Sequence, residues 1–217
     1  MQLNSCFSIE CSNQETLEKV FNLVNTFFAM PENRTPEFFD DWVKSIRVNE
    51  KYNIVENITD VHADPLEYED LLASMIEYVS AGISDDVIAG HYDTDNGVSG
   101  MKEHLFVGIY GNFQWVSSRK KLFAIEYEDR QLPLAPHLKD KIVVFSQLYN
   151  LALEFKYTVI VRRSGGLVRD YTTAKTNVVV YMGQWATPDT KKAEELNQKK
   201  EKVKVFTCEE FEAFLKQ

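Results

Sequence analysis

The sequence predicts an α+β domain followed by an α/β domain, and three observations support this division. Residues 1–138 carry 10 Lys+Arg against 23 Asp+Glu, a net −13, and residues 139–217 carry 14 against 10, a net +4, which together give −9. Two prolines, Pro133 and Pro136, stand where the charge changes and disfavour a helix across that point. The strand and helix patterns also differ on the two sides. We therefore expect one domain over residues 1–132 and another over residues 137–217.

Composition places the chain among folded globular proteins. It has 217 residues, of which 44% are hydrophobic and 12% aromatic. No apolar run is long enough to cross a bilayer, and the N-terminus lacks the pattern of a signal peptide. Cys6, Cys11 and Cys208 stand at unrelated spacings, which indicates reduced thiols rather than a disulfide framework. We expect a cytoplasmic protein without a membrane partner, and composition leaves the oligomeric state open.

The first half of the chain shows strand and helix patterns in alternation. Alternating polarity from Cys6 to Cys11 predicts a half-buried strand. Apolar residues at helical spacing predict a helix over residues 14–28, which Ser12 or Asn13 can cap. The next expected elements are a short helix over 37–48, a strand over 51–58 and a helix from Pro65 to Val79.

Residues 82–100 are rich in glycine and aspartate, with few apolar residues after Ile88, and are expected to form a long loop or a bent connection. A hairpin is expected next, with strands over 104–115 and 121–127 joined by residues 117–120. These elements predict an α+β layer, for which a ferredoxin-like fold is a candidate. This half resembles no family that we recognise.

The second half has a clearer order of elements. The predicted elements are a strand over 141–145, a turn at Gly165-Gly166, strands over 167–170 and 177–181, a helix begun by Thr187 and Pro188, a strand over 203–206, and a last helix opened by a Thr207/Glu210 capping box. The β-branched segment 157–161 prefers a strand by local propensity.

That order of elements over residues 139–217 resembles a BRCT module, and is most similar to the version that ends bacterial NAD-dependent DNA ligases. The resemblance implies a parallel four-stranded sheet flanked by helices, in the order β-α-β-β-α-β-α. It also implies a helix just before Gly165, so we expect residues 157–161 to be helical against their local preference. BRCT modules hold protein partners or DNA and are not catalysts.

Many BRCT modules bind a phosphoserine peptide, and the resemblance implies where such a pocket would lie. Ser146 takes the place of the hydroxyl after the first strand, and Gly166 that of the turn amide. Asp189 stands at the position of the usual lysine and would repel phosphate, although Lys191 or Lys192 could reach across. We therefore favour contacts through other surfaces, with Ser146 simply ending its strand.

Two further groups of residues suggest chemistry. Histidines His62 and His91, with the aspartates beside them, could in principle combine to hold zinc, but we favour polar loop residues and expect no metal or cofactor. A faint calcium-loop pattern at residues 93–97 is better explained as a turn. The acidic residues of the predicted loop could instead imitate a phosphate backbone; they are Asp85, Asp86, Asp93 and Asp95.

The sequence thus favours a non-enzymatic, two-domain interaction protein of bacterial or phage type, linked to DNA replication or repair. Its BRCT-like half would dock a protein partner, and the basic charge of that half would allow only weak contact with DNA. The alternative is a phage-type inhibitor whose acidic half imitates DNA to block a nuclease or defence complex. A third hypothesis is a metal-dependent hydrolase centred on His62 and His91.

Overall fold

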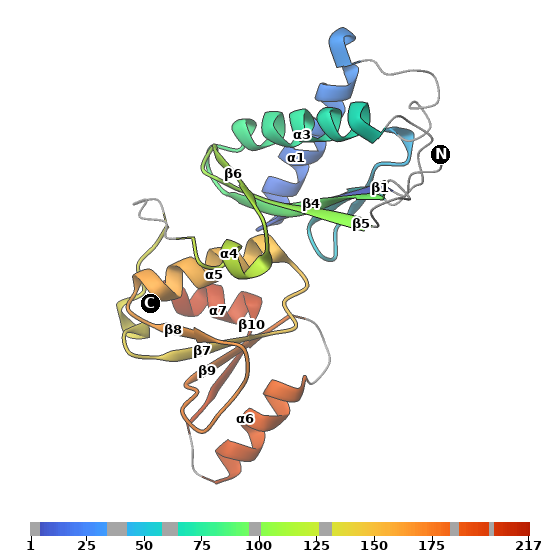
Figure 1. The fold of residues 1–217 in the computed structure, drawn as a ribbon. Helices are drawn as coiled ribbons and strands as arrows, with labels where there is room; N and C mark the ends of the chain where they lie inside the picture. The colour runs from blue at the N-terminus through green and yellow to red at the C-terminus, as the bar shows by residue number, and fades with distance from the viewer. Residues whose placement is uncertain are drawn as a thin grey trace. The chain divides into compact units, whose positions relative to one another are not determined.

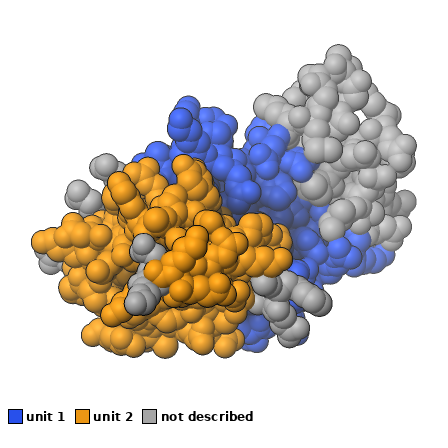
Figure 2. Space-filling view, turned by 90° about the horizontal axis from the view of Figure 1, so that it is seen from below, with its two compact units in different colours: residues 1–124, 150–153 blue, residues 125–149, 154–217 orange. Residues whose placement is uncertain are grey.

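The computed structural model divides the chain into two compact units. It describes residues 5–33, 43–57, 65–95, 101–125, 132–182, 187–199 and 202–217. Unit 1 contains residues 1–124 and 150–153, and unit 2 contains residues 125–149 and 154–217 (Figure 2). The division after residue 124 precedes the expected junction at residues 132–136. Within the described ranges, none of the helices is both long and apolar enough to cross a membrane.

Unit 1 is a six-stranded antiparallel sheet with the strand order β2-β3-β1-β4-β5-β6. Helices α1 and α3 cover the same face of this sheet (Figure 1). The elements are β1 (Ser5–Cys11), α1 (Gln14–Ala29), the 3-10 turn η1 (Pro31–Asn33), β2 (Arg47–Asn49), β3 (Ile54–Asn57), α3 (Pro65–Gly82), β4 (Val87–Asp95), β5 (Met101–Ile109), β6 (Asn112–Val116) and α4 (Arg119–Leu122).

The core of unit 1 lies between the sheet and its two helices. On β1 the alternate residues Phe7, Ile9 and Cys11 are buried in this core, as the alternation in the sequence predicts. The predicted helix is confirmed as α1, whose amino end is capped by Asn13: its side chain accepts a 2.9 Å hydrogen bond from Thr16 N.

Strand β4 corrects the long loop expected over residues 82–100. Val87, Ile88 and Ala89 are fully buried, so this segment is an interior strand of the sheet. One of the glycines that suggested a loop is Gly90, where an added Cβ would lie 1.9 Å from the carbonyl oxygen of Ser8 on β1. Glycine is needed here because two strands approach closely, not because the chain turns. Residues 96–100 lie outside the described ranges.

Two other expected elements of unit 1 are also wrong in part. The chain reverses at Tyr110 and Gly111, which have φ of 48° and 82°, so the hairpin joins β5 to β6 and ends sooner than expected. The expected second strand over 121–127 begins as α4, whose cap Ser118 accepts from Lys121 N, and residues 126–127 are outside the described part. The helix expected over 37–48 is wrong at its end, because β2 begins at Arg47. Residues 37–42 of that expected helix are outside the described part.

Unit 2 is a four-stranded parallel sheet with the strand order β10-β9-β7-β8. Helices α5 and α7 lie on one face of it and α6 on the other (Figure 1). The elements are the 3-10 turn η2 (Pro136–Leu138), β7 (Ile142–Ser146), α5 (Leu151–Arg163), β8 (Leu167–Arg169), β9 (Val178–Tyr181), α6 (Pro188–Gln198), β10 (Lys204–Thr207) and α7 (Cys208–Leu215). From β7 onward the order is β-α-β-β-α-β-α.

Helix α5 contains the β-branched segment that locally prefers a strand. Its residues Tyr157, Val159, Ile160 and Val161 are all at most 3% exposed. A helix buried on nearly all sides selects large apolar side chains, so burial outweighs the local preference. The expected capping box of α7 is also confirmed.

Candidate functional sites

Ser146 lies at the carboxyl end of β7 in a closed cluster of polar side chains. Its Oγ lies 2.8 Å from both Thr187 Oγ1 and Asp189 Oδ2, at the amino end of α6. The other carboxylate oxygen of Asp189 accepts a 2.7 Å hydrogen bond from Thr172 N. Ser146 and Thr187 are 3% and 1% exposed. The protein's own carboxylate therefore already satisfies the Ser146 hydroxyl and the Thr172 amide.

The other expected members of this phosphate pocket do not join Ser146. Gly166 precedes β8, and because Leu167 pairs with Ile142 in the parallel register, Gly166 lies at the amino edge of the sheet. Lys191 is exposed on α6, and Lys192 forms a 2.8 Å ion pair with Glu195 on the same helix. The expected grouping of these residues is therefore not found: Ser146 stands at the carboxyl edge and Gly166 at the opposite one.

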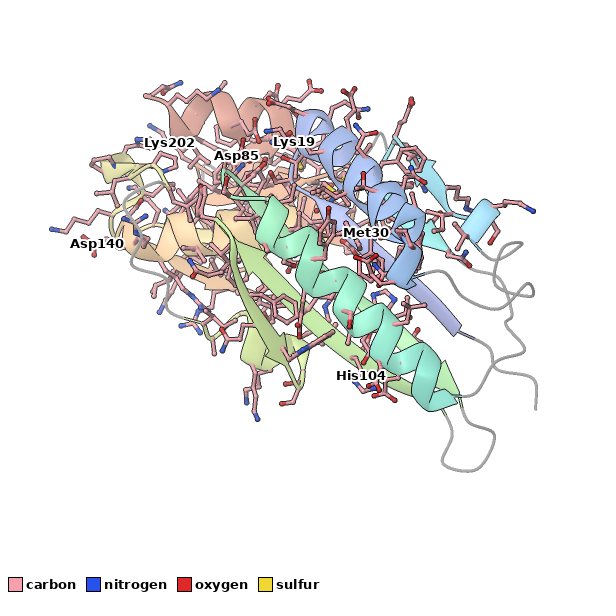
Figure 3. All side chains as sticks on the ribbon, turned by 90° about the horizontal axis from the view of Figure 1, so that it is seen from above. Lys19, Met30, Asp85, His104, Asp140 and Lys202 are labelled. Carbon is pink, nitrogen blue, oxygen red and sulfur yellow. The ribbon has the colours of Figure 1, made fainter. Side chains whose placement is uncertain are left out.

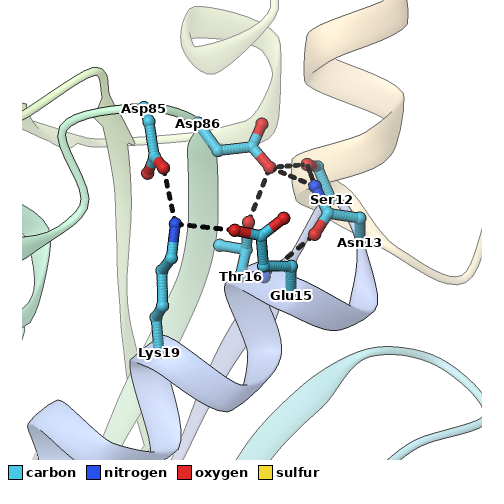
Figure 4. A network of polar contacts seen from close by, with 7 residues as sticks. All are labelled: Ser12, Asn13, Glu15, Thr16, Lys19, Asp85 and Asp86. Carbon is cyan, nitrogen blue, oxygen red and sulfur yellow. Dashed lines mark hydrogen bonds and ion pairs between the residues drawn. The ribbon is translucent and has the colours of Figure 1, made fainter.

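Asp86 is a structural residue of unit 1. It is 5% exposed and lies beside the amino end of α1 (Figure 4). Its Oδ2 accepts hydrogen bonds from the Ser12 hydroxyl, from Asn13 Nδ2 at 2.5 Å and from the Thr16 hydroxyl at 2.7 Å. A carboxylate here is stabilised by these donors and by the helix dipole. Asp86 is therefore not available to imitate a phosphate group.

The remaining residues of the expected acidic loop are dispersed. Asp85 is exposed and forms an ion pair with Lys19, with 2.5 Å between Asp85 Oδ2 and Lys19 Nζ (Figure 3). The hydrogen bonds that the Lys19 ammonium donates to Asp85 and Glu15 raise its pKa. Asp93 and Asp95 belong to β4 rather than to a loop, and the side chain of Asp95 is outside the described part. The structure thus does not gather the three aspartates with described side chains, Asp85, Asp86 and Asp93, into one acidic surface.

A basic pocket opens at the amino edge of the unit 2 sheet, and we call it the amino-edge pocket. Its volume is about 390 Å³, within the range of small-ligand sites. It is formed by the residues just before or at the start of β7, β9 and β10, by η2 and by the end of α7. The lining residues are His137, Lys141, Asn177, Val178, Lys202, Lys204, Phe214 and Gln217.

Hydrogen bonds of the Asn177 backbone and side chain hold this edge in place. Its side-chain oxygen accepts from Ile142 N at 2.8 Å, its own N donates to Ile142 O, and its carbonyl accepts from Lys204 N, both at 2.9 Å. One residue thereby aligns the starts of β7, β9 and β10. The lysines beside these strand starts therefore lie at the same edge of the sheet.

An aromatic ring organises the cationic side chains of the pocket. Lys204 Nζ lies 4.6 Å from the centre of the Phe214 ring, a cation–π contact. The His137 ring packs against the same phenyl ring, with 4.4 Å between centroids, and its Nε2 is buried without a hydrogen-bond partner among the described residues. Phe214 therefore holds an ammonium group and an imidazole beside the same cavity.

The chemistry of the amino-edge pocket suits an anion. Three lysines line it, and none of the described lining residues is acidic. Lysine ammonium groups at one cavity can donate charge-assisted hydrogen bonds to a phosphate or carboxylate. In the sequence Lys141 stands about sixty residues before Lys202 and Lys204, so spacing alone does not reveal the group. The available signal is that each stands next to a predicted parallel strand, and parallel strands start at one edge.

The histidines separate into different surroundings. His91 and Asp93 lie on β4, and Glu103 lies on β5. Each of the three residues offers one potential ligand atom, and these atoms all lie within 4.8 Å of one another. His104 stacks on Tyr92 with 4.4 Å between ring centroids (Figure 3). The Nε2 atom of His104 lies 3.4 Å from a carboxylate oxygen of Glu69 on α3. His62, the expected partner of His91, is outside the described residues.

The described cysteines are poor nucleophiles. Burial, with the nearby charges of Asp86 and Glu10, raises the pKa of the Cys11 thiol well above its usual range. Burial and the charge of Glu212 raise the pKa of the Cys208 thiol to about 12. Both thiols are therefore protonated at neutral pH, and the thiolate is the reactive form of cysteine.

Comparison with protein-family models, with curated proteins and with solved structures gives no match to this chain.

Proposed function

We propose that the protein is a non-enzymatic interaction protein whose BRCT-type unit 2 docks an anionic segment of a protein partner. Two features support the BRCT-type assignment: the β-α-β-β-α-β-α order of unit 2, and its parallel four-stranded sheet with helices on both faces. The resemblance to the ligase-terminal module suggests a partner that works in DNA replication or repair.

The observation that carries the proposal is the amino-edge pocket. Lys141, Lys202 and Lys204 line one cavity there, and the ring of His137 forms part of its wall. A pocket of this size accepts one or two carboxylate or phosphate groups rather than a length of duplex. The net charge of −9 further disfavours a long nucleic-acid interface, since affinity for DNA depends on many phosphate contacts. We therefore favour an acidic protein segment, anchored by one anionic group.

The carboxyl edge of the sheet is the less suitable anion site. There Asp189 already satisfies Ser146 and the Thr172 amide, so an incoming phosphate would meet a carboxylate. Binding of a phosphoserine peptide at Ser146 would require Asp189 to move away from a largely buried cluster. The proposed docking site is therefore at the opposite edge from the one that the family pattern implies.

Unit 1 is assigned a supporting role in this proposal. Its first four strands and two long helices follow the order β-α-β-β-α-β, which is that of ferredoxin-like domains, and β5 and β6 extend the sheet. We propose that it provides a second contact for the partner. The alternative role as an imitation of DNA loses support because Asp86 is buried and Asp85 is paired with Lys19.

Partner capture with matched variants of the full chain tests this proposal. The pocket variant is Lys141→Ala/Lys204→Ala, and the control is Lys191→Ala/Lys192→Ala, which removes the same charge from α6. Each exposed charge contact contributes about 0.7 kcal/mol, so the pocket variant should lose about tenfold in affinity. Proteins captured from a nuclease-treated lysate of the source organism are compared quantitatively.

A partner retained by the wild type and the control but lost by the pocket variant is the expected result. Its binding should weaken with added salt, because exposed charges are screened. Equal retention by both variants would contradict docking at the pocket. Loss of all captured protein after nuclease treatment would show DNA to be the ligand instead.

A further inference from the structure

We propose that unit 1 binds a divalent transition-metal ion through His91, Asp93 and Glu103. These residues come from adjacent antiparallel strands, β4 and β5. The inference is independent of partner docking because the residues belong to unit 1 and the amino-edge pocket to unit 2. It also departs from the sequence-based expectation that the protein holds no metal.

The three side chains share one face of the sheet. Ile88 and Tyr92 are buried in the core with α1 and α3, so the alternate residues His91 and Asp93 face away from those helices. Glu103 pairs directly with Asp93 in the register of β4 and β5 and therefore lies on the same face. The backbone thus fixes a triad of ligating side chains without any loop.

The distances are close to those of a metal site. The three ligand atoms lie within 4.8 Å of one another, and His91 Nε2 is 3.9 Å from Asp93 Oδ2. Ligands at about 2.0–2.2 Å from a zinc ion stand roughly 3–4 Å apart, so small rotations of the side chains close the site. The side chains of His91 and Asp93 are only 29% and 16% exposed, which limits the number of alternative rotamers.

Charge gives a second reason for a cation at this place. Two carboxylates directly opposite each other on neighbouring strands repel and destabilise the pairing. Asp93 and Glu103 are such a pair. A divalent ion between them converts this repulsion into attraction, and the neighbouring imidazole supplies a neutral ligand.

The ligand set indicates the class of ion. One imidazole nitrogen with two carboxylate oxygens suits zinc, manganese or iron(II), whereas magnesium and calcium sites are built from oxygen ligands. Three protein ligands leave at least one coordination position for water. We therefore assign the site to a first-row transition ion, with zinc as the probe.

Metal titration of the full chain, freed of tag and dialysed against a chelator, tests the assignment. Calorimetry should show one high-affinity Zn²⁺ site per chain, and Co²⁺ should give a visible absorption spectrum typical of nitrogen and oxygen ligands. His91→Ala is expected to weaken binding about 100-fold and Glu103→Gln about tenfold, since loss of even an outer partner costs 10–100-fold. Glu77→Gln, which alters an exposed carboxylate on α3, is the control and should bind as the wild type does.

The fold of each variant is checked by circular dichroism without metal. If His91→Ala loses the fold, Glu103→Gln at the exposed end of the triad still decides the question. Absence of Zn²⁺ binding by the wild type would overturn the proposal. Binding by both triad variants as tight as that of the wild type would overturn it too. A thiolate charge-transfer band with Co²⁺ would also overturn it, because it would place the ion on a cysteine.

Discussion

Replacing Asp86 by alanine should strongly destabilise unit 1, whereas replacing its neighbour Asp85 should not. The two carboxylates are adjacent in the sequence and have the same charge. Asp86 is buried and accepts from Ser12, Asn13 and Thr16, while Asp85 is exposed and contacts Lys19. The comparison therefore separates a structural carboxylate from a surface one.

The size of the effect follows from the hydrogen bonds that Asp86 accepts. A hydrogen bond to a charged group contributes about 1.5–3 kcal/mol, but members of one network are not additive. Removing one partner from a buried charged network costs about 3–5 kcal/mol. We take the lower end of this range because water can reach part of this helix end. We expect Asp86→Ala to lower the free energy of unfolding by about 3 kcal/mol. For a unit of this size, that corresponds to a fall in Tm of about 10 °C.

Urea denaturation followed by circular dichroism and tryptophan fluorescence measures the difference. The transition of unit 1 should move to lower urea in Asp86→Ala, with an unchanged slope. Asp85→Ala should unfold as the wild type does, since Lys19 retains its contact with Glu15. Equal and small effects of the two substitutions would refute the assignment of Asp86 to the cap of α1.

Three other substitutions or reagents test separate parts of the structure. Gly90→Ala should cost about 4 kcal/mol or more and unfold unit 1 in circular dichroism, because its Cβ would meet the Ser8 carbonyl; a folded variant would contradict the close approach of β1 and β4. Asp189→Ala should lower the stability of unit 2 by about 2 kcal/mol in urea denaturation, through loss of its contacts with Ser146 and Thr172; an unchanged midpoint would argue against the closed cluster. Alkylation of Cys208 by iodoacetamide should increase about tenfold per pH unit beyond pH 9, because its pKa is raised to about 12, and a plateau near pH 9 would contradict that. Since this pKa lies above that of an unfolded thiol, near 8.5, stability should fall as the pH rises between the two values.

Local signals predicted the elements whose ends or faces are encoded nearby. Helix α1 follows from its cap and apolar spacing, and the cap at Thr187 and the capping box at Thr207 mark the starts of α6 and α7. The resemblance correctly placed a helix over residues 157–161, where propensity alone would have placed a strand. Burial of residues 157–161 explains that difference.

Features that depend on distant parts of the chain were missed. Gly90 resembles a loop residue until Ser8 of the neighbouring strand is known to lie against it. The turn at Tyr110 has a left-handed backbone at a residue type that rarely signals one. The lysines of the amino-edge pocket come together only because β7 and β10 start at the same edge of a parallel sheet.

The central claim is that unit 2 binds an anion at the amino edge of its sheet and not at the carboxyl edge. Titration of the isotope-labelled full chain with pyrophosphate, followed by amide NMR shifts, compares the two edges in one experiment. The proposal predicts shifts at the amides of His137, Asn177 and Lys204, lost in Lys141→Ala/Lys204→Ala and retained in Lys191→Ala/Lys192→Ala. Shifts centred on Ser146 and Thr187, or none at either edge, would contradict it.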